Sequence, residues 1–133
     1  PEKKAANGKE SILLVEDEKD LLEMITIMLE QFGYRVFPAI APTEAIHIAK
    51  SSSIKIDLLI TDVIMPGMSG RDLADMICII SPTIKCLFMS GYTDDIISHH
   101  GVLDGSLEFI HKPFSMDELA AKVRYVIDGT KYP

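Results

Sequence analysis

Several short apolar runs of this sequence end in polar residues whose types suit phosphoryl chemistry. These residues are Glu16, Asp17, Asp62, Ser90 and Lys112. A parallel sheet brings the carboxyl ends of its strands to one edge, where ligands bind, so the five side chains should meet in one crevice. Gly91 follows the serine and would let a ligand approach the backbone closely.

The three carboxylates predict a cation. At about 4 Å, each ionised pair costs roughly 4 kcal/mol at an effective dielectric near 20. A hard divalent cation offsets this repulsion and prefers oxygen ligands, and Mg²⁺ also takes phosphate oxygens. Lys112 can hold a phosphate as a point charge, and Ser90 can donate its hydroxyl hydrogen. The set indicates phosphoryl transfer, in which catalysis is mostly positioning and charge neutralisation.

Each of these residues also has a simpler explanation. Glu16 and Asp17 could merely favour the N-terminus of the helix that follows them. Asp62 could be a strand-end residue without a partner. Ser90 could belong to a turn, and Lys112 could be solvated. Each simpler explanation is plausible for one residue. It is much less expected that all of them apply together at one end of one sheet, and this favours a common chemical role.

Five apolar runs alternate with five segments of helical spacing. We expect the strands at residues 12–15, 34–37, 56–60, 86–89 and 109–110. Several runs are continuously apolar, which is typical of parallel strands covered on both faces. The alternation predicts an α/β fold with a doubly wound parallel sheet and right-handed crossovers.

Apolar residues at helical spacing predict the first three helices. Gly33 ends the first helix, and Pro42 suits the first turn of the second. Ser69 is the expected N-cap of the third, which stops before Pro82. The residues expected on their buried faces are Leu21, Leu22, Ile25, Met28, Leu29, Phe32, Ile46, Ala49, Leu73, Met76, Ile77 and Ile80.

The last two helices differ in how clearly they begin. A short fourth helix is expected at residues 93–101. The fifth begins with a capping box of Ser115 and Glu118, with Phe114 and Leu119 at the positions of a hydrophobic staple. Its buried face should comprise Leu119, Val123, Val126 and Ile127.

Length and charge narrow the class of protein. A chain of 133 residues suits one domain, and we place it at residues 11–128, between a flexible linker or tail at 1–10 and a C-terminal tail at 129–133. A net charge of −7 argues against a nucleic-acid surface, and no apolar run is long enough to span a bilayer. Cys78 and Cys86 lack metal-ligand spacing and are expected to be small buried hydrophobes in a reducing, cytoplasmic compartment.

Four motifs together resemble the receiver domain of two-component response regulators. They are ILLVEDE (12–18), LLITDVIMPGMSG (58–70), MSGY (89–92) and FIHKPF (109–114). The resemblance extends over residues 11–127 and is specific in combination, although VEDE or KPF alone would be weak. It implies a flavodoxin-like (βα)5 fold with strand order 2-1-3-4-5.

The resemblance also implies roles at the site. Asp62 would take a phosphoryl group from a phosphohistidine of a histidine kinase or a histidine phosphotransfer domain. Mg²⁺, or Mn²⁺ in its place, would be bound by Glu16, Asp17, Asp62 and the backbone carbonyl of Ile64. Lys112 would contact the phosphoryl oxygens.

Further implied roles concern the response to phosphorylation. Ser90 and Gly91 would also contact the phosphoryl group, and the bond before Pro113 would be cis. Ser90 and Phe109 would form the switch, the hydroxyl moving toward the phosphoryl group and the ring turning inward. New hydrogen bonds to the added charge would bias an equilibrium that already exists.

The sequence departs from the usual pattern of that family at the switch. It also places no side chain beside the phosphoryl group that would promote its hydrolysis. The switch aromatic is often tyrosine, and Phe109 has no hydroxyl to bond when it turns inward. Ile64 and Tyr92 should border the phosphoryl group, and neither suits the orientation of an attacking water. We therefore expect slow self-dephosphorylation.

The resemblance also indicates, in less detail, which longer protein this domain belongs to and where a partner would bind. MSGYTDD with FIHKPFS is similar to receivers fused to hybrid histidine kinases, and the first residue is not Met, which suggests a piece of a longer chain. A response regulator or a stand-alone receiver would look nearly the same. A downstream protein would bind the face of the fourth helix, fifth strand and fifth helix.

Three other functions are less consistent with the sequence. The isolated domain would catalyse only its own phosphorylation and dephosphorylation, so it need not be an enzyme. A phosphatase of the haloacid dehalogenase type would need a DxD motif after its first strand, where this chain has Glu16-Asp17-Glu18. A flavodoxin would need a phosphate-binding loop there. A receiver that serves only as an unphosphorylated interaction module usually lacks the acceptor Asp, an acidic residue or the Lys, and all are present here.

Overall fold

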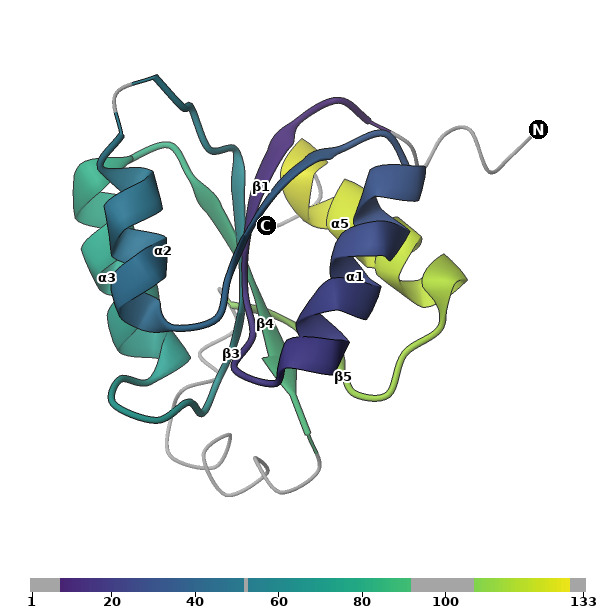
Figure 1. Ribbon diagram of the computed structural model, residues 1–133. Helices are drawn as coiled ribbons and strands as arrows, with labels where there is room; N and C mark the ends of the chain where they lie inside the picture. Colours follow the sequence, from purple (N-terminus) through teal and green to yellow (C-terminus); the bar gives the residue numbers. More distant parts are fainter. Residues whose placement is uncertain (1–7, 52, 92–106, 130–133) are drawn as a thin grey trace.

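The computed structural model describes residues 8–51, 53–91 and 107–129. Within these residues, strands and helices alternate along most of the chain (Figure 1). Their bounds are β1 Ser11–Val15, α1 Lys19–Gln31, β2 Arg35–Ala39, α2 Pro42–Ala49, β3 Leu58–Asp62, α3 Gly70–Ile80, β4 Lys85–Ser90, β5 Glu108–His111 and α5 Met116–Asp128. The fourth helix predicted at 93–101 lies outside the described residues.

The strands form one five-stranded parallel sheet with the order β2-β1-β3-β4-β5. The predicted fold class and strand order are therefore confirmed. Helices α1 and α5 cover one face of the sheet, and α2 and α3 cover the other (Figure 1). Each face has its own apolar core, so β1 and β3 are buried along their whole length.

The second strand begins and ends later than predicted. It includes Pro38, which we had placed after the strand. Proline has no amide hydrogen for a ladder, but β2 pairs only with β1 and is an edge strand, where one unpaired side is tolerated. Tyr34, predicted in the strand, precedes it and is 3% exposed in the core beneath α1 and α5.

The third strand is also shifted toward the C-terminus. It starts at Leu58, two residues after the start of the apolar run predicted at residues 56–60, and it ends at Asp62, the residue expected at its end. Thr61 and Asp62 are polar yet 0% and 5% exposed, because the ladder with β4 continues to the pair Asp62 and Met89. Ile56, expected in this strand, is buried just before it.

The predicted helix starts are confirmed in detail. Ser69 caps α3 by accepting a hydrogen bond from the amide of Asp72 at 3.0 Å. Ser115 and Glu118 form both bonds of the capping box, at 3.0 and 2.8 Å. After α1, Gly33 has a φ of 101°, a conformation that glycine adopts without strain.

Met76 is a correction to the predicted core. It is 41% exposed, whereas Leu73 and Ile77 are fully buried. Ala74 lies beside them, so the small side chain of alanine and not the methionine completes the buried stripe of α3. A residue adjacent to Ile77 lies about 100° away around a helix, which brings Met76 out to solvent.

The two cysteines are free thiols and are half-buried between α3 and β4. Burial, followed by the neighbouring thiol of Cys78, raises the pKa of Cys86 to about 12. The thiolate of Cys86 is therefore scarce at neutral pH, which agrees with the prediction of an unreactive core residue.

Residues 8–10, which we assigned to a tail, hydrogen-bond to the domain. The amide of Gly8 donates to the carbonyl of Phe32 at 3.1 Å. Arg124 of α5 pairs with Glu10 at 2.8 Å and with Asp128 at 3.0 Å. These contacts hold the first described segment at the amino ends of the strands, against the C-terminal turn of α5.

Helix α3 packs very closely on the end of β3. Its first residue, Gly70, donates its amide to the carbonyl of Val63 at 2.8 Å. A Cβ at Gly70 would overlap the carbonyl oxygen of Asp62. A glycine is required here because the backbone of the helix leaves no space for a side chain next to that strand end.

We predict that Gly70→Ala destabilises the fold by about 1–3 kcal/mol, as overpacking usually does. The added methyl group must displace the backbone of Asp62 or of α3. Urea unfolding measures the change, and Asp75→Ala, at an exposed position of the same helix, is the control, expected within about 0.5 kcal/mol of wild type. Equal stability of Gly70→Ala and wild type would contradict the prediction.

Candidate functional site

The sheet brings the predicted polar residues to one edge. Glu16 and Asp17 follow β1, Asp62 ends β3, Ser90 ends β4, and Lys112 follows β5. All five strands are parallel, so these positions are all at the carboxyl edge of the sheet.

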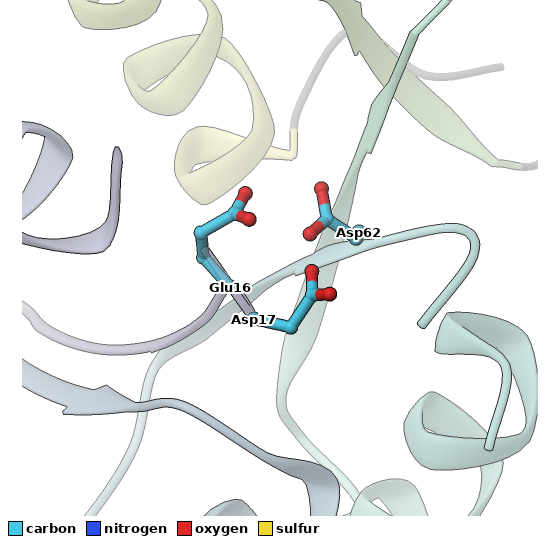
Figure 2. A group of neighbouring side chains, drawn as sticks. All are labelled: Glu16, Asp17 and Asp62. Carbon is cyan, nitrogen blue, oxygen red and sulfur yellow. The ribbon is translucent and has the colours of Figure 1, made fainter. Parts of the chain in front are cut away.

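The three acidic residues form a compact cluster. One carboxylate oxygen from each of Glu16, Asp17 and Asp62 lies within 4.8 Å of the others. Figure 2 shows the three side chains gathered around one small space between the ends of β1 and β3. Glu16 and Asp62 are 1% and 5% exposed, while Asp17 is open to solvent. The cluster is thus buried on one side and accessible on the other.

Lys112 provides the positive charge of the site. Its Nζ lies 2.6 Å from Oδ1 of Asp62 and 2.8 Å from Oε1 of Glu16. The side chain is 25% exposed, so the ammonium is partly withdrawn from water. These two contacts answer two of the simpler explanations, because Asp62 has a partner and Lys112 is not simply solvated.

The carboxyl of Asp62 holds its proton unusually well. Burial, opposed by the hydrogen bond from Lys112 and reinforced by the charge of Glu16, raises its pKa from 3.8 to about 8. One ammonium shared between two acids therefore does not compensate fully for the desolvation of Asp62. A further cation at the cluster would favour the ionised form.

The charge on Lys112 is well supported in the same cluster. Burial by itself would lower its pKa, but the hydrogen bonds to Asp62 and Glu16 outweigh this effect and raise the pKa above its usual value. Lys112 therefore stays cationic at neutral pH and available to an anion.

Glu16 is held from two sides. Its Oε2 accepts a hydrogen bond from the amide of Glu18 at 2.9 Å, and its Oε1 accepts one from the ammonium of Lys112. Glu18 is the N-cap residue of α1 and its own side chain makes no capping bond. The start of α1 thus positions Glu16 in the cluster through the backbone amide of Glu18, a contact that our sequence analysis missed because the identity of a side chain does not report a backbone bond.

A shallow pocket of about 320 Å³ opens over the cluster. It is lined by Glu16, Asp17, Glu18, Asp62, Ile64, Gly91 and Lys112. Ile64 is 49% exposed, so an apolar side chain borders the acidic pocket. Tyr92, predicted to border it too, lies outside the described residues.

The predicted switch residues lie on neighbouring strands. Ser90 is 4% exposed at the end of β4, and Phe109 is half-buried in β5 with its ring 5.6 Å from that of Phe88. The hydroxyl of Ser90 is 3.2 Å from Nδ1 of His111, a partner that the sequence analysis did not find. The bond between Lys112 and Pro113 is cis, the geometry that the resemblance implies.

The donor set suits a hard divalent cation. Three carboxylates offer oxygen ligands within 4.8 Å of one another, and burial, with the charge of Glu16, raises the pKa of Asp62, so a cation beside it would favour its ionised form. The exposed side of Asp17 and the pocket above it leave space for water or phosphate oxygens, which Mg²⁺ retains as ligands. The residues present can therefore hold such an ion.

Comparisons with known proteins agree with this arrangement. The family described as the response regulator receiver domain matches residues 12–124. This chain therefore belongs to the receiver domain family of two-component signalling.

Individual relatives come from several kinds of signalling protein. The chain is 34% identical over 123 residues to the sensor kinase CckA of Brucella abortus, covering 92% of this chain and 13% of that protein. It is 38% identical over 115 residues to the transcriptional regulatory protein YvrH of Bacillus subtilis, covering 86% of this chain and 47% of that protein. The chain thus spans less than half the length of these two curated relatives.

The fold has solved counterparts as well. A response regulator receiver domain protein from Clostridium thermocellum superposes with a TM-score of 0.79 at 30% identity, covering 92% of this chain and 97% of that one.

Within residues 8–51, 53–91 and 107–129, no helix is long and apolar enough to cross a bilayer.

We predict that Asp62→Asn stabilises the metal-free protein at pH 9 by about 1–3 kcal/mol. The pKa of Asp62 is higher in the folded state, so its carboxyl lowers stability as pH rises from 3.8 to about 8, and a neutral amide removes that cost. Thermal unfolding with a chelator measures the difference.

The same variant should respond oppositely to metal. Added Mg²⁺ should raise the unfolding temperature of wild type more than that of Asp62→Asn, because the variant lacks one of the three carboxylates. If Asp62→Asn is less stable than wild type at pH 9 without metal, ionisation of Asp62 does not destabilise the folded protein and the prediction is wrong.

Proposed function

We propose that this receiver domain accepts a phosphoryl group from a phosphohistidine onto Asp62, with Mg²⁺ as cofactor. The observation that carries the proposal is the cluster of three carboxylates within 4.8 Å of one another, with the ammonium of Lys112 at 2.6 Å from Asp62. Membership of the receiver family supports the same reaction.

The reaction needs little covalent chemistry from the protein. A carboxylate oxygen of Asp62 attacks the phosphorus atom, the new P–O bond forms, and the P–N bond of the donor breaks. The electron pair of that bond returns to the imidazole nitrogen. Glu16, Asp17, Asp62 and the carbonyl of Ile64 would hold Mg²⁺, which supplies charge neutralisation for the carboxylates and the transferred phosphoryl group.

Lys112 and the end of β4 are proposed to receive the transferred group. Lys112 already contacts the acceptor carboxylate, so its ammonium is within reach of oxygens attached to Asp62. Gly91 lines the same pocket and can bring the backbone close to them. Ser90 would donate its hydroxyl hydrogen after a rotation, and Phe109 would turn inward behind it.

The added charge would act on the β4 and β5 side of the domain. A phosphoryl group brings about −1.5 to −2 charge and three strong acceptors. Bonds from Ser90 and Lys112 to it would draw two strand ends together and bias an equilibrium between two arrangements.

Partners are proposed at two places. The donor would be a histidine kinase or histidine phosphotransfer domain that reaches the pocket over Asp17, in the cytoplasm. A downstream protein would bind the described part of the face formed with β5 and α5, where a groove of about 590 Å³ runs between the two elements. Phe109 and Tyr125 lie in this groove, which gives the partner an aromatic surface.

A hybrid histidine kinase is our proposal for the parent protein, supported by the match to the sensor kinase CckA.

Phosphorylation is tested by intact mass after brief incubation with acetyl phosphate and Mg²⁺. We expect wild type to gain the mass of one phosphoryl group, and Asp62→Ala to gain none. Omitting the metal should abolish the gain, since the carboxylates would then repel the incoming phosphate.

Two controls make this result decisive. Circular dichroism should show that Asp62→Ala is folded, and Asp75→Ala, an exposed carboxylate on α3, should react like wild type. No mass gain in folded wild type, with a phosphohistidine donor as well as acetyl phosphate, would refute the proposal and favour an unphosphorylated interaction module.

A second prediction concerns the lifetime of the phosphorylated state. Ile64 borders the pocket with an apolar side chain that cannot orient water, so hydrolysis should be slow. Ile64→Asn should accelerate loss of the phosphoryl group about fivefold, the effect of one added hydrogen bond of typical strength. The decay of the phosphorylated mass measures the rate, with Ile64→Leu as the matched apolar control. Hydrolysis that is unchanged or slower in Ile64→Asn would contradict the prediction.

A further inference from the structure

The hydroxyl of Ser90 is engaged away from the acidic cluster. It lies 3.2 Å from Nδ1 of His111, and Ser90 is 4% exposed. The pocket over the cluster is lined by Gly91 and Lys112, the next residues in each strand, but Ser90 is not among its lining residues. In this arrangement the hydroxyl therefore faces β5 and not the place where a phosphoryl group would be.

The contact follows from the register of the two strands. Ser90 and His111 are direct partners in the parallel ladder, so their side chains project from the same face of the sheet. The amide of Lys112 also donates to the carbonyl of Ser90 at 2.9 Å, which fixes the two backbones against each other. Two positions earlier in the ladder, Phe88 and Phe109 pair on the same face, with their ring centroids 5.6 Å apart and the rings tilted by 34°.

A serine hydroxyl has one hydrogen to donate. When Nδ1 of His111 accepts that hydrogen, the same hydroxyl cannot also donate it to a phosphoryl oxygen. The ring of His111 is at the exposed end of β5, so Nε2 can carry the imidazole hydrogen and leave Nδ1 as the acceptor. Engagement of Ser90 by the phosphoryl group then requires the bond to His111 to break.

We propose that His111 is a positioning residue that holds the Ser90 hydroxyl in the unphosphorylated arrangement and so opposes the switch. This inference rests on the proposed function, because the opposing state is the phosphorylated one. Loss of the bond therefore raises the fraction of molecules in the reactive arrangement.

The test compares initial rates of phosphorylation by acetyl phosphate with Mg²⁺, followed by intact mass. When the reactive arrangement is a minor population, the rate rises in proportion to that population. We expect His111→Leu to react about fivefold faster than wild type, the factor that corresponds to one hydrogen bond of typical net strength. His111→Asn, whose amide can take the place of Nδ1, should return the rate toward that of wild type.

A double-mutant cycle separates this role from a structural one. In a Ser90→Ala background, His111→Leu should no longer change the rate, because the hydroxyl that it releases is absent. His47→Leu on α2 is the control for loss of an exposed histidine, and it should react like wild type. Amide resonances of Ser90 and Phe109 in unphosphorylated His111→Leu should also shift toward their positions in phosphorylated wild type.

The outcomes distinguish this inference from the function on which it rests. If wild type reacts but His111→Leu reacts at the same rate or more slowly, the inference is overturned and the proposed function stands. A gain that persists in Ser90→Ala also overturns it. If wild type takes up no phosphoryl group from either donor, both fail.

Discussion

The site depends on two carboxylates, those of Glu16 and Asp62, that are buried beside one ammonium at the carboxyl edge of the sheet. Two of the three clustered carboxylates, those of Glu16 and Asp62, share the ammonium of Lys112, and burial raises the pKa of Asp62 to about 8. Strand β3 pairs with β4 as far as Asp62 and Met89, so the ladder places the carboxylate of Asp62 at this edge of the sheet. In the proposed function the cost of ionising Asp62 would be relieved by a bound cation, because a nearby positive charge favours the ionised form of a carboxyl group.

The two sides of the site differ in how firmly they are held. On the β1 and β3 side, the amide of Glu18 fixes Glu16, and Gly70 packs against the carbonyl of Asp62. On the β4 and β5 side, the contacts of Ser90 and Lys112 are side-chain bonds that can exchange one partner for another. In the proposed function, a phosphoryl group on Asp62 would therefore act mainly through the side chains of β4 and β5, since α3 packs closely on the backbone of Asp62.

Local chemistry explains which features could be predicted from the sequence. The capping box at Ser115 depends on residues three positions apart, and the continuous apolar runs reveal buried strands wherever they lie, so both were found. Exposure of Met76 and the inclusion of Pro38 in β2 depend on which neighbours each element has, which hydropathy alone does not report. The partnership of Ser90 with His111 depends on strand register, and this emerges only when two segments 21 residues apart are aligned.

The contacts of Arg124 have a consequence for how such a domain is built into a larger protein. Gly8 is fixed beside the end of α1, and Glu10 is tied to α5 near Asp128, at the edge of the sheet opposite the acidic pocket. Polypeptide joined at either end would start from that far edge. A neighbouring domain could then be attached without standing between Asp62 and an incoming donor. The first and last described residues and the acidic pocket thus lie at opposite edges of the sheet.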